Sequence, residues 1–350
     1  MYLREAVTED NVELQNLQSQ CPMGTSLIVS IVNTPDFFAR AKVHERHKVY
    51  VVCEAGRIIG SGAGAVHEAV VNGQLSSVGY EFQYFTSPNR RRQGVAVLLH
   101  QHIEDYFRTE NVVLSFCTIL EDNLSSVRFF ETQGYKHHRS LVMPTLPIYK
   151  KFDVLSEEKI RSAKAEDLEG VADLLYRTWG SCNLYEPYTA KSLARFVGRT
   201  QAYGLEDILI FEDQREILAC LSRWDYNRTR RLIVKELSPK LRTIALLADF
   251  IRLVRPMPQL PKPGINVTRW SLTHIGFKHP RYLTLLIKFV NNQALEKGAD
   301  QLYFVCERNS MLLNAIQGLF HTNVDIHLYV KPFEKELSPD TPVSPATIDP

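Results

Sequence analysis

The chain has 350 residues, and 45% of them are hydrophobic, which is enough for two ordinary globular cores. Its 41 basic and 39 acidic residues nearly cancel, so the overall charge argues against nucleic acid and against a membrane as partners. The six cysteines are widely spaced without a Cys-x-x-Cys pair, which favours reduced, mostly buried thiols over a disulfide framework.

The sequence does not open with a charged-then-apolar leader, and no apolar run approaches the ~20 residues that span a bilayer. A cytoplasmic location is therefore expected. Three close histidine pairs lack the Cys, Asp or Glu partners that a zinc site needs, so no metal is expected. They are His44 with His47, His100 with His102, and His137 with His138.

A strand, a tight turn and an amphipathic helix are predicted between residues 78 and 108. Apolar residues recur at helical spacing after residue 97, and the strand-like run ends at Thr86. The first amides of a helix have no intrahelical acceptor, so the turn between the two elements can bind a phosphate. Gly94 lets the backbone approach an anion, and Arg90, Arg91 and Arg92 stand beside it. The alternative is a solvated surface loop.

A second strand and a second helix follow in the predicted order. Residues 111–119 are apolar and typical of a strand, and the helix after them continues through Glu131. Gly134 fits the end of this helix, because glycine readily adopts the left-handed conformation found there.

Together these segments resemble the GNAT superfamily of acyl-CoA-dependent N-acyltransferases. Its pyrophosphate loop, Arg/Gln-x-x-Gly-x-Gly/Ala, is matched by Arg91, Gly94 and Ala96. Its second motif, Asn-x-x-Ala-x-x-Phe-Tyr-Glu-x-x-Gly-Phe, is similar to the segment from Asn123 to Tyr135. The resemblance covers roughly residues 1–150, and two motifs in the right order are more specific than either alone.

The resemblance implies an α/β fold with a central mixed, mostly antiparallel sheet, flanking helices and a splayed parallel strand pair. It implies acetyl-CoA as co-substrate, with the pantetheine arm against one strand of that pair and the pyrophosphate on the turn. It also places variable substrate-binding helices over residues 25–46. The residues it assigns to the cofactor are Phe85, Thr86, Arg91, Arg92, Gln93, Gly94, Val95, Ala96, Val97, Asn123, Ser126 and Phe130.

An internal repeat predicts two tandem domains of this kind. The pattern Leu3-Arg4-x-Ala6-x-x-Glu9-Asp10 recurs as Ile160-Arg161-x-Ala163-x-x-Glu166-Asp167. Two further echoes follow in the same order, Glu121-Asp122-Asn123 with Glu307-Arg308-Asn309, and Gln133-Gly134 with Gln317-Gly318.

The predicted boundaries follow from this repeat. They are a GNAT domain that binds acetyl-CoA (1–145), a linker (146–158), a degenerate GNAT-like domain (159–333) and a disordered Pro/Ser-rich tail (334–350). The linker is placed after Met143, where Pro144 and Pro147 interrupt the periodic pattern. The second domain is called degenerate because its counterpart of the phosphate turn, residues 277–283, contains no glycine and carries Pro280.

Amide formation needs a base, an oxyanion donor and an acid for the leaving thiolate. Glu81 is the predicted base, since related enzymes carry a glutamate on this strand; alternatively it is a solvated carboxylate. The family's acid is the tyrosine of Phe-Tyr-Glu, but the matching residue is Phe130. Tyr135, Tyr84 or a water could replace it, or the thiolate could leave unassisted; Tyr135 could also be a core residue.

Two functions are compatible with the sequence. The first is an N-acetyltransferase that moves an acetyl group from acetyl-CoA to a primary amine by direct attack in a ternary complex. The second is a non-catalytic CoA-binding regulatory or scaffold protein. A small-molecule or peptide amine is the expected partner of the first, and the two copies are expected to form an internal pseudo-dimer or a homodimer.

Overall fold

The computed structural model describes residues 1–252 and 254–345. In the first half the chain forms β1 (Tyr2–Glu5), α1 (Asn11–Ser19), β2 (Leu27–Asn33), α2 (Ala39–Lys42), β3 (Arg46–Glu54), β4 (Arg57–Val71), β5 (Gln74–Thr86), α3 (Val95–Thr109), β6 (Leu114–Leu120), α4 (Leu124–Thr132) and β7 (Lys136–Pro147). In the second half it forms β8 (Ile160–Ser162), α5 (Leu168–Trp179), α6 (Ala190–Arg199), β9 (Ile208–Asp213), β10 (Glu216–Asp225), β11 (Arg230–Leu237), α7 (Pro239–Ile251), β12 (Arg269–Phe277), α8 (Pro280–Glu296), β13 (Gln301–Tyr303), β14 (Cys306–Glu307), α9 (Leu312–Ala315) and β15 (Thr322–Pro332).

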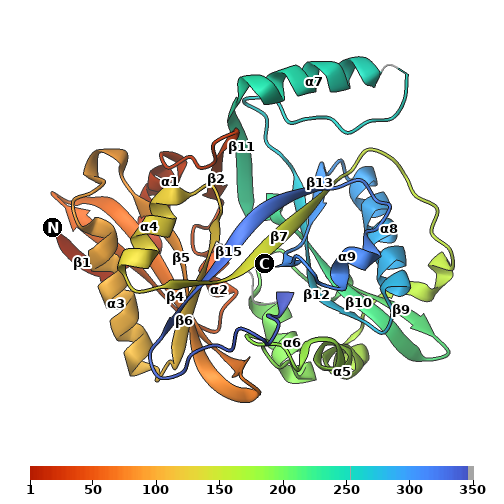
Figure 1. Cartoon of the computed structure of the whole chain (residues 1–350), viewed down its shortest axis with the longest axis horizontal. Coiled ribbons are helices and arrows are strands. Elements are labelled where there is room, and N and C mark those ends of the chain that lie inside the picture. The colour runs from red at the N-terminus through yellow and green to blue at the C-terminus, as the bar shows by residue number, and fades with distance from the viewer. Residues whose placement is uncertain (253, 346–350) are drawn as a thin grey trace.

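One mixed sheet runs through both halves, with helices on its faces (Figure 1). Its strand order is β1-β3-β4-β5-β6-β15-β7-β13-β12-β10-β9-β8, and β14 pairs with β7 beside this path. Two neighbouring pairs are parallel, β5 with β6 and β12 with β13, one in each half. The predicted fold class, two tandem units with a parallel pair in each, is confirmed.

The sequence repeat corresponds to the same local structure at the start of each half. Arg4 forms a two-point ion pair with Asp10 at 2.6 and 2.7 Å, and Arg161 does the same with Asp167 at 2.6 and 2.8 Å. Each aspartate also accepts a hydrogen bond from the backbone amide three residues before it. The repeated residues therefore fasten the first strand to the first helix in both halves.

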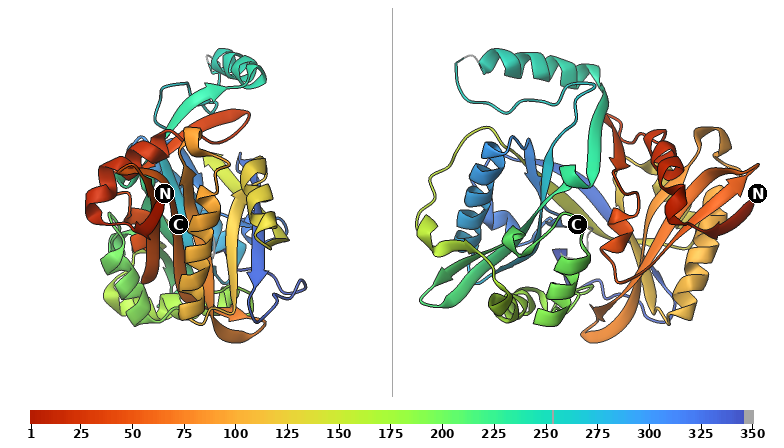
Figure 2. Two further views of the ribbon diagram at one scale, coloured as in Figure 1. Left: turned by 90° about the vertical axis from the view of Figure 1, so that its left-hand side faces the viewer. Right: turned by 180° about the vertical axis from the view of Figure 1, so that it is seen from behind.

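The two halves exchange a strand. β15 comes from the end of the chain but lies between β6 and β7, where it pairs with β6 over Ile326–Pro332. In return, β7 pairs with β13 of the second half. A second, two-stranded sheet also joins the halves, because β2 pairs with β11 along its whole length. Figures 1 and 2 show β7 and β15 side by side at the centre of the molecule.

Three local predictions are wrong. Residues 27–33 form a strand rather than a substrate-binding helix, because β11 supplies a pairing partner that sequence-local reasoning cannot see. Pro144 lies within β7 and does not interrupt it, whereas Pro147 is the last residue of the strand. On one edge of β7, the residues before Pro144 pair with β14 and the residues after it pair with β13. Pro144 lies between these two paired segments, so its missing amide breaks no hydrogen bond of the sheet on that edge.

The predicted disordered tail is also wrong for residues 334–345, and residues 346–350 lie outside the described residues. Leu337 and Val343 are buried in the core of the first half. The backbone at Pro342 and Ser344 bonds to Asn183 of the second half. The tail thus packs across the junction of the two halves, which its Pro/Ser-rich composition did not indicate.

The cysteine prediction is confirmed, since all six thiols are free and five are buried. Within residues 1–252 and 254–345, no helix is long and apolar enough to cross a membrane.

Candidate active site

The two central strands of the first half diverge at a bulge in β5. β5 and β6 pair in parallel only from Val78 to Tyr80, opposite Leu114 to Phe116. Just beyond, Gln83 has a positive φ of 56°, and the register with β4 shifts. The strands therefore separate from residue 81 onward. Phe85 and Thr86, the predicted pantetheine contacts, lie on this diverging part of β5.

The predicted phosphate turn lies at the start of α3. Gly94 has a φ of 82° directly before the helix, a conformation that strains other residues. In the described part of the chain, the amides of residues 93 to 97 meet no hydrogen-bond acceptor. Arg90 is engaged by Glu54 at 2.6 Å, whereas Arg91 and Arg92 are exposed. Arg91 to Gly94 therefore form an exposed turn, and the amides from Gln93 to Val97, at the turn and the first residues of α3, are free donors, although the side chain of Val95 is buried.

Glu81 lies where the strands begin to separate, and its side chain is buried. It accepts hydrogen bonds from the hydroxyls of Tyr84 and Tyr135, the second at 2.6 Å. The Nδ1 atom of His100 lies 3.1 Å from the same carboxylate. Glu81 is 2% exposed, so it is not the solvated carboxylate considered as the alternative. The two predicted catalytic residues, Glu81 and Tyr135, are in direct contact.

A chain of charges extends from Glu81 along α3. His100 lies between Glu81 and Glu104, and Lys331 of β15 binds Glu104 from the other side. Burial alone would lower the pKa of His100, but its ion pairs with Glu104 and Glu81 raise it to about 9. Burial would raise the pKa of Glu104, but His100 and Lys331 lower it to about 2. This arrangement is a charged relay that runs from Glu81 through His100 and Glu104 to Lys331.

Sequence reasoning missed three of these residues. His100 and Glu104 are four residues apart, so their contact on one helix face could have been predicted from the sequence spacing. The contact of Lys331 with Glu104 could not have been predicted, because only the strand exchange brings Lys331 to the first half.

The residues predicted from the second cofactor motif have structural roles in α4 and in the core beside it. Asn123 caps α4, where its side-chain oxygen accepts from the amide of Ser126 at 3.3 Å. Phe130 is buried against Tyr84, Tyr135 and Tyr329. Asn123 and Ser126 therefore fix the helix start, and Phe130 belongs to an aromatic cluster beside Glu81.

In the corresponding turn of the second half, the first amides of the helix are already hydrogen-bonded or missing. The ring of His279 accepts a hydrogen bond from the amide of Arg281 at 3.2 Å, and Pro280 has no amide to donate. In contrast with the turn at Gly94, this helix start offers fewer free donors to an anion.

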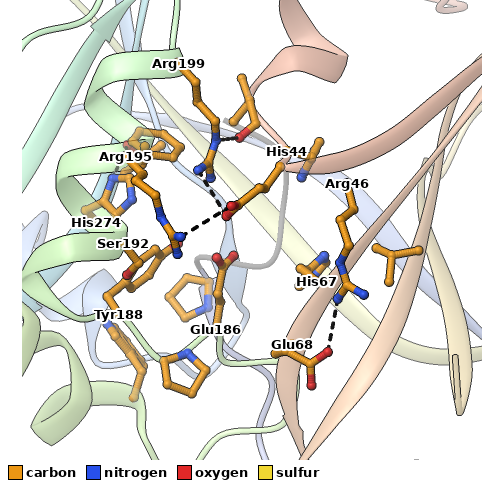
Figure 3. Close-up of a pocket in the computed structure, with 18 of the residues that line it drawn as sticks. His44, Arg46, His67, Glu68, Glu186, Tyr188, Ser192, Arg195, Arg199 and His274 are labelled. Carbon is orange, nitrogen blue, oxygen red and sulfur yellow. Dashed lines mark hydrogen bonds and ion pairs between the residues drawn. The ribbon is translucent and has the colours of Figure 1, made fainter. Parts of the chain in front are cut away.

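A cavity of about 410 Å³ lies between the two halves, on the side of α2 and α6 (Figure 3). His44 and His67 from the first half stack at 6.2 Å, and the His44 ring lies 5.5 Å from Phe82 of β5. Phe82 directly precedes the bulge at Gln83. His44 therefore lies between the cavity and the stretch of β5 where the strands separate.

Most charges in this cavity are paired. Glu45 binds Arg195 at 3.5 Å and Arg199 at 3.8 Å, and Glu68 binds Arg46 at 3.0 Å. Glu186 has no ion-pair partner among the described residues, and Figure 3 shows its carboxylate pointing into the cavity. Burial raises the pKa of Glu186 to about 7, against the influence of Arg199. It is therefore a carboxylate available to a cation.

Similarity to known proteins agrees with this geometry. The profile of the acetyltransferase (GNAT) family matches residues 12–135. The chain is 24% identical over 293 residues to the probable N-acetyltransferase HLS1 of Arabidopsis thaliana, covering 73% of this chain and 71% of that protein.

Two solved structures show the same fold. One is Saccharomyces cerevisiae N-myristoyltransferase with bound myristoyl-CoA, with a TM-score of 0.66, 11% identity, and coverage of 99% of this chain and 83% of that chain. The other is the GCN5-related glucosamine N-acetyltransferase region of a fungal multi-domain GH3 β-N-acetylglucosaminidase, with a TM-score of 0.61, 13% identity, and coverage of 94% and 38%.

The charge on His100 predicts a pH-dependent stability. Because its pKa rises from the ordinary 6.5 to about 9, its stabilisation is complete below pH 6.5 and is lost as the pH rises through 9. The effect is on the order of 3 kcal/mol. Urea unfolding from pH 6 to 10 should show that His100→Gln costs most at low pH and little at high pH. His102→Gln, on the same helix without a carboxylate partner among the described residues, should cost the same throughout.

Proposed function

We propose that the chain is a tandem two-domain member of the GNAT superfamily of acyltransferases and that it acetylates a primary amine with acetyl-CoA. The observation that carries the proposal is the turn of free amides at Gly94, directly beside the separating strands β5 and β6. Amides at a helix start bind phosphate through their hydrogens and the helix dipole. The pyrophosphate of CoA would bind there, with the pantetheine arm along Phe85 and Thr86.

Aromatic packing near the bulge supports a short acyl group. Tyr80 stacks on Phe82 and on Phe116, each pair with ring centroids 5.0 Å apart. These rings occupy the face of the sheet toward α2, next to the place where the strands separate. A long acyl chain would have to displace them, whereas an acetyl group would not.

The acceptor amine would bind in the cavity between the halves. Glu186 would attract it as the ammonium ion, since an unpaired carboxylate in a low-dielectric cavity favours a cation. Nearby imidazoles, such as His44 with its pKa lowered by burial, stay neutral and do not repel a cation. A volume of about 410 Å³ suits a small molecule or the end of a peptide.

In the proposed reaction the bound ammonium ion first releases one proton to water, and the neutral amine nitrogen then attacks the thioester carbonyl carbon. A carbon–nitrogen bond forms, the carbon–sulfur bond breaks, and the amine proton passes to Glu81 directly or through water. A backbone amide near Phe85 would bind the oxyanion. Burial raises the pKa of Tyr135, so its hydroxyl stays a donor that holds Glu81 in place. The thiolate can leave unassisted, since the pKa of a thiol is about 8.5.

A non-catalytic CoA-binding protein is the second candidate. Phe130 favours it, because a phenylalanine at the family's acid position cannot give a proton to the thiolate. Both candidates predict that acetyl-CoA raises the melting temperature. Only the enzyme predicts the release of free CoA with some amine in a broad panel.

Replacing Gly94 tests the donor site. Gly94→Val should abolish the thermal shift caused by acetyl-CoA, because a side chain at φ 82° strains the turn and crowds the phosphate. Gly73→Val is the matched control: its φ is 79°, and an added Cβ likewise meets nothing within 4 Å. It should lower the melting temperature by a similar amount while keeping the acetyl-CoA shift. A shift that persists in Gly94→Val would place CoA elsewhere.

Replacing Glu81 tests the proposed base. Glu81→Gln should lower turnover by about tenfold or more, because positioned bases typically contribute at least that factor. The dependence of kcat on pH should change as well, while the KM for acetyl-CoA stays the same. Steady-state measurements of kcat and of the KM for acetyl-CoA over a range of pH values test whether Glu81 is the base. An unchanged pH profile would remove Glu81 from the mechanism.

Replacing Glu186 tests the acceptor cavity. Glu186→Gln should raise the KM for the amine about tenfold and leave the KM for acetyl-CoA unchanged, because one buried ion pair is lost. In the unaltered protein the amine should bind more weakly as the pH falls through about 7, where Glu186 becomes protonated. Glu68→Gln, whose carboxylate is already paired with Arg46, should have little effect. Equal effects of the two variants would contradict this assignment.

A further inference from the structure

α7 stands away from the rest of the molecule. It follows β11 and is seen at the outer edge in all three views of Figures 1 and 2. None of its side chains is buried. On its inner side, Leu241 packs on the small cluster of Val234, Leu237 and Val267. The outward side of the helix is therefore without a partner in the described part of the chain.

This outward side is apolar. Phe250 is 74% exposed and Leu246 is 72% exposed, and they are four residues apart, so they share one face. Leu247 is 61% exposed and adjoins this face, and Val254 continues the apolar surface beyond the helix. Large side chains gathered on one exposed stripe mark an interaction surface, whereas scattered ones need no explanation.

Positive charge is concentrated around this face. Residues 235–262 contain six basic and two acidic residues, a net charge of +4. The whole chain has a net charge of +2, so the other residues sum to −2. Lys240 and Arg255 form no ion pair with any described residue. The near-neutral total charge, which predicts no membrane partner, averages over this local excess.

We propose that α7, together with the loop to Lys262, binds the surface of an anionic lipid bilayer. The exposed stripe around Leu246 and Phe250 enters the boundary between headgroups and acyl chains, and the basic residues contact lipid phosphates. The helix has 13 residues, about 20 Å, so it lies along the surface and does not cross it.

The charge excludes a second copy of the chain as the favoured occupant. Two such faces brought together would each carry a net charge of +4 and would repel. An anionic bilayer complements both properties of the face, its apolar stripe and its cations. The pairing of β11 with β2 attaches the helix firmly to the body, so binding at α7 would hold the whole protein at the membrane.

Vesicle co-sedimentation of the full-length chain tests the proposal. The protein should sediment with vesicles of equal parts phosphatidylcholine and phosphatidylglycerol, and much less with phosphatidylcholine alone. The double variant L246Q/F250Q should reduce binding about tenfold or more, because each side chain loses its apolar burial. K240Q/R255Q should reduce binding to the anionic vesicles and flatten its dependence on salt.

Leu155→Gln is the matched control, because Leu155 is 75% exposed and lies outside this segment. It should bind like the unaltered protein. Equal binding to both vesicle types, no binding to either, or normal binding by L246Q/F250Q would each overturn the proposal. A concentration-dependent dimer without lipid that L246Q/F250Q abolishes would assign the face to a second copy and overturn it too.

Discussion

The exchange of β7 and β15 between the two halves is the constraint on which the rest of the structure depends. A strand inside a sheet must find partners for its backbone groups on both edges, because unpaired amides and carbonyls in a core are costly. Here β6 finds its second partner in β15, from the far end of the chain, and β13 finds its partner in β7. Neither half completes its sheet alone. The exchange also fixes how the halves meet, and with that the walls of the cavity between them.

The two halves have retained different parts of a common design. Both keep the Arg–Asp fastening at their start and the parallel strand pair. Only the first keeps a helix start with free amides, since His279 and Pro280 close the corresponding turn of the second. The second half instead supplies Lys331 to the buried relay and Glu186 to the cavity. In the proposed reaction one half would bind the acyl donor, and the other would help to bind the acceptor.

Much of the first half could be predicted from local signals. The positive φ values of Gly94 and Gly134 are where the motifs place them, because glycine is the residue that adopts this conformation without strain. The repeat around Asp10 and Asp167 was readable because it specifies contacts only six residues apart. The errors at residues 27–33 and 334–345 share one cause: in both, a distant segment supplies the partner that sets the structure. Composition and periodicity carry no information about such partners.

The sequence by itself indicated the resemblance to the GNAT superfamily, the order of the central elements and the turn at Gly94, since each depends on residues close together in the chain. Only the tertiary structure decided that Glu81 is buried against Tyr135, that β15 completes the first sheet, and that Glu186 faces a cavity otherwise lined by paired charges. It also revealed that the apolar side of α7 faces outward, although its periodicity resembles that of any amphipathic helix. Periodicity specifies which residues share a face, whereas packing across the whole chain decides what that face meets.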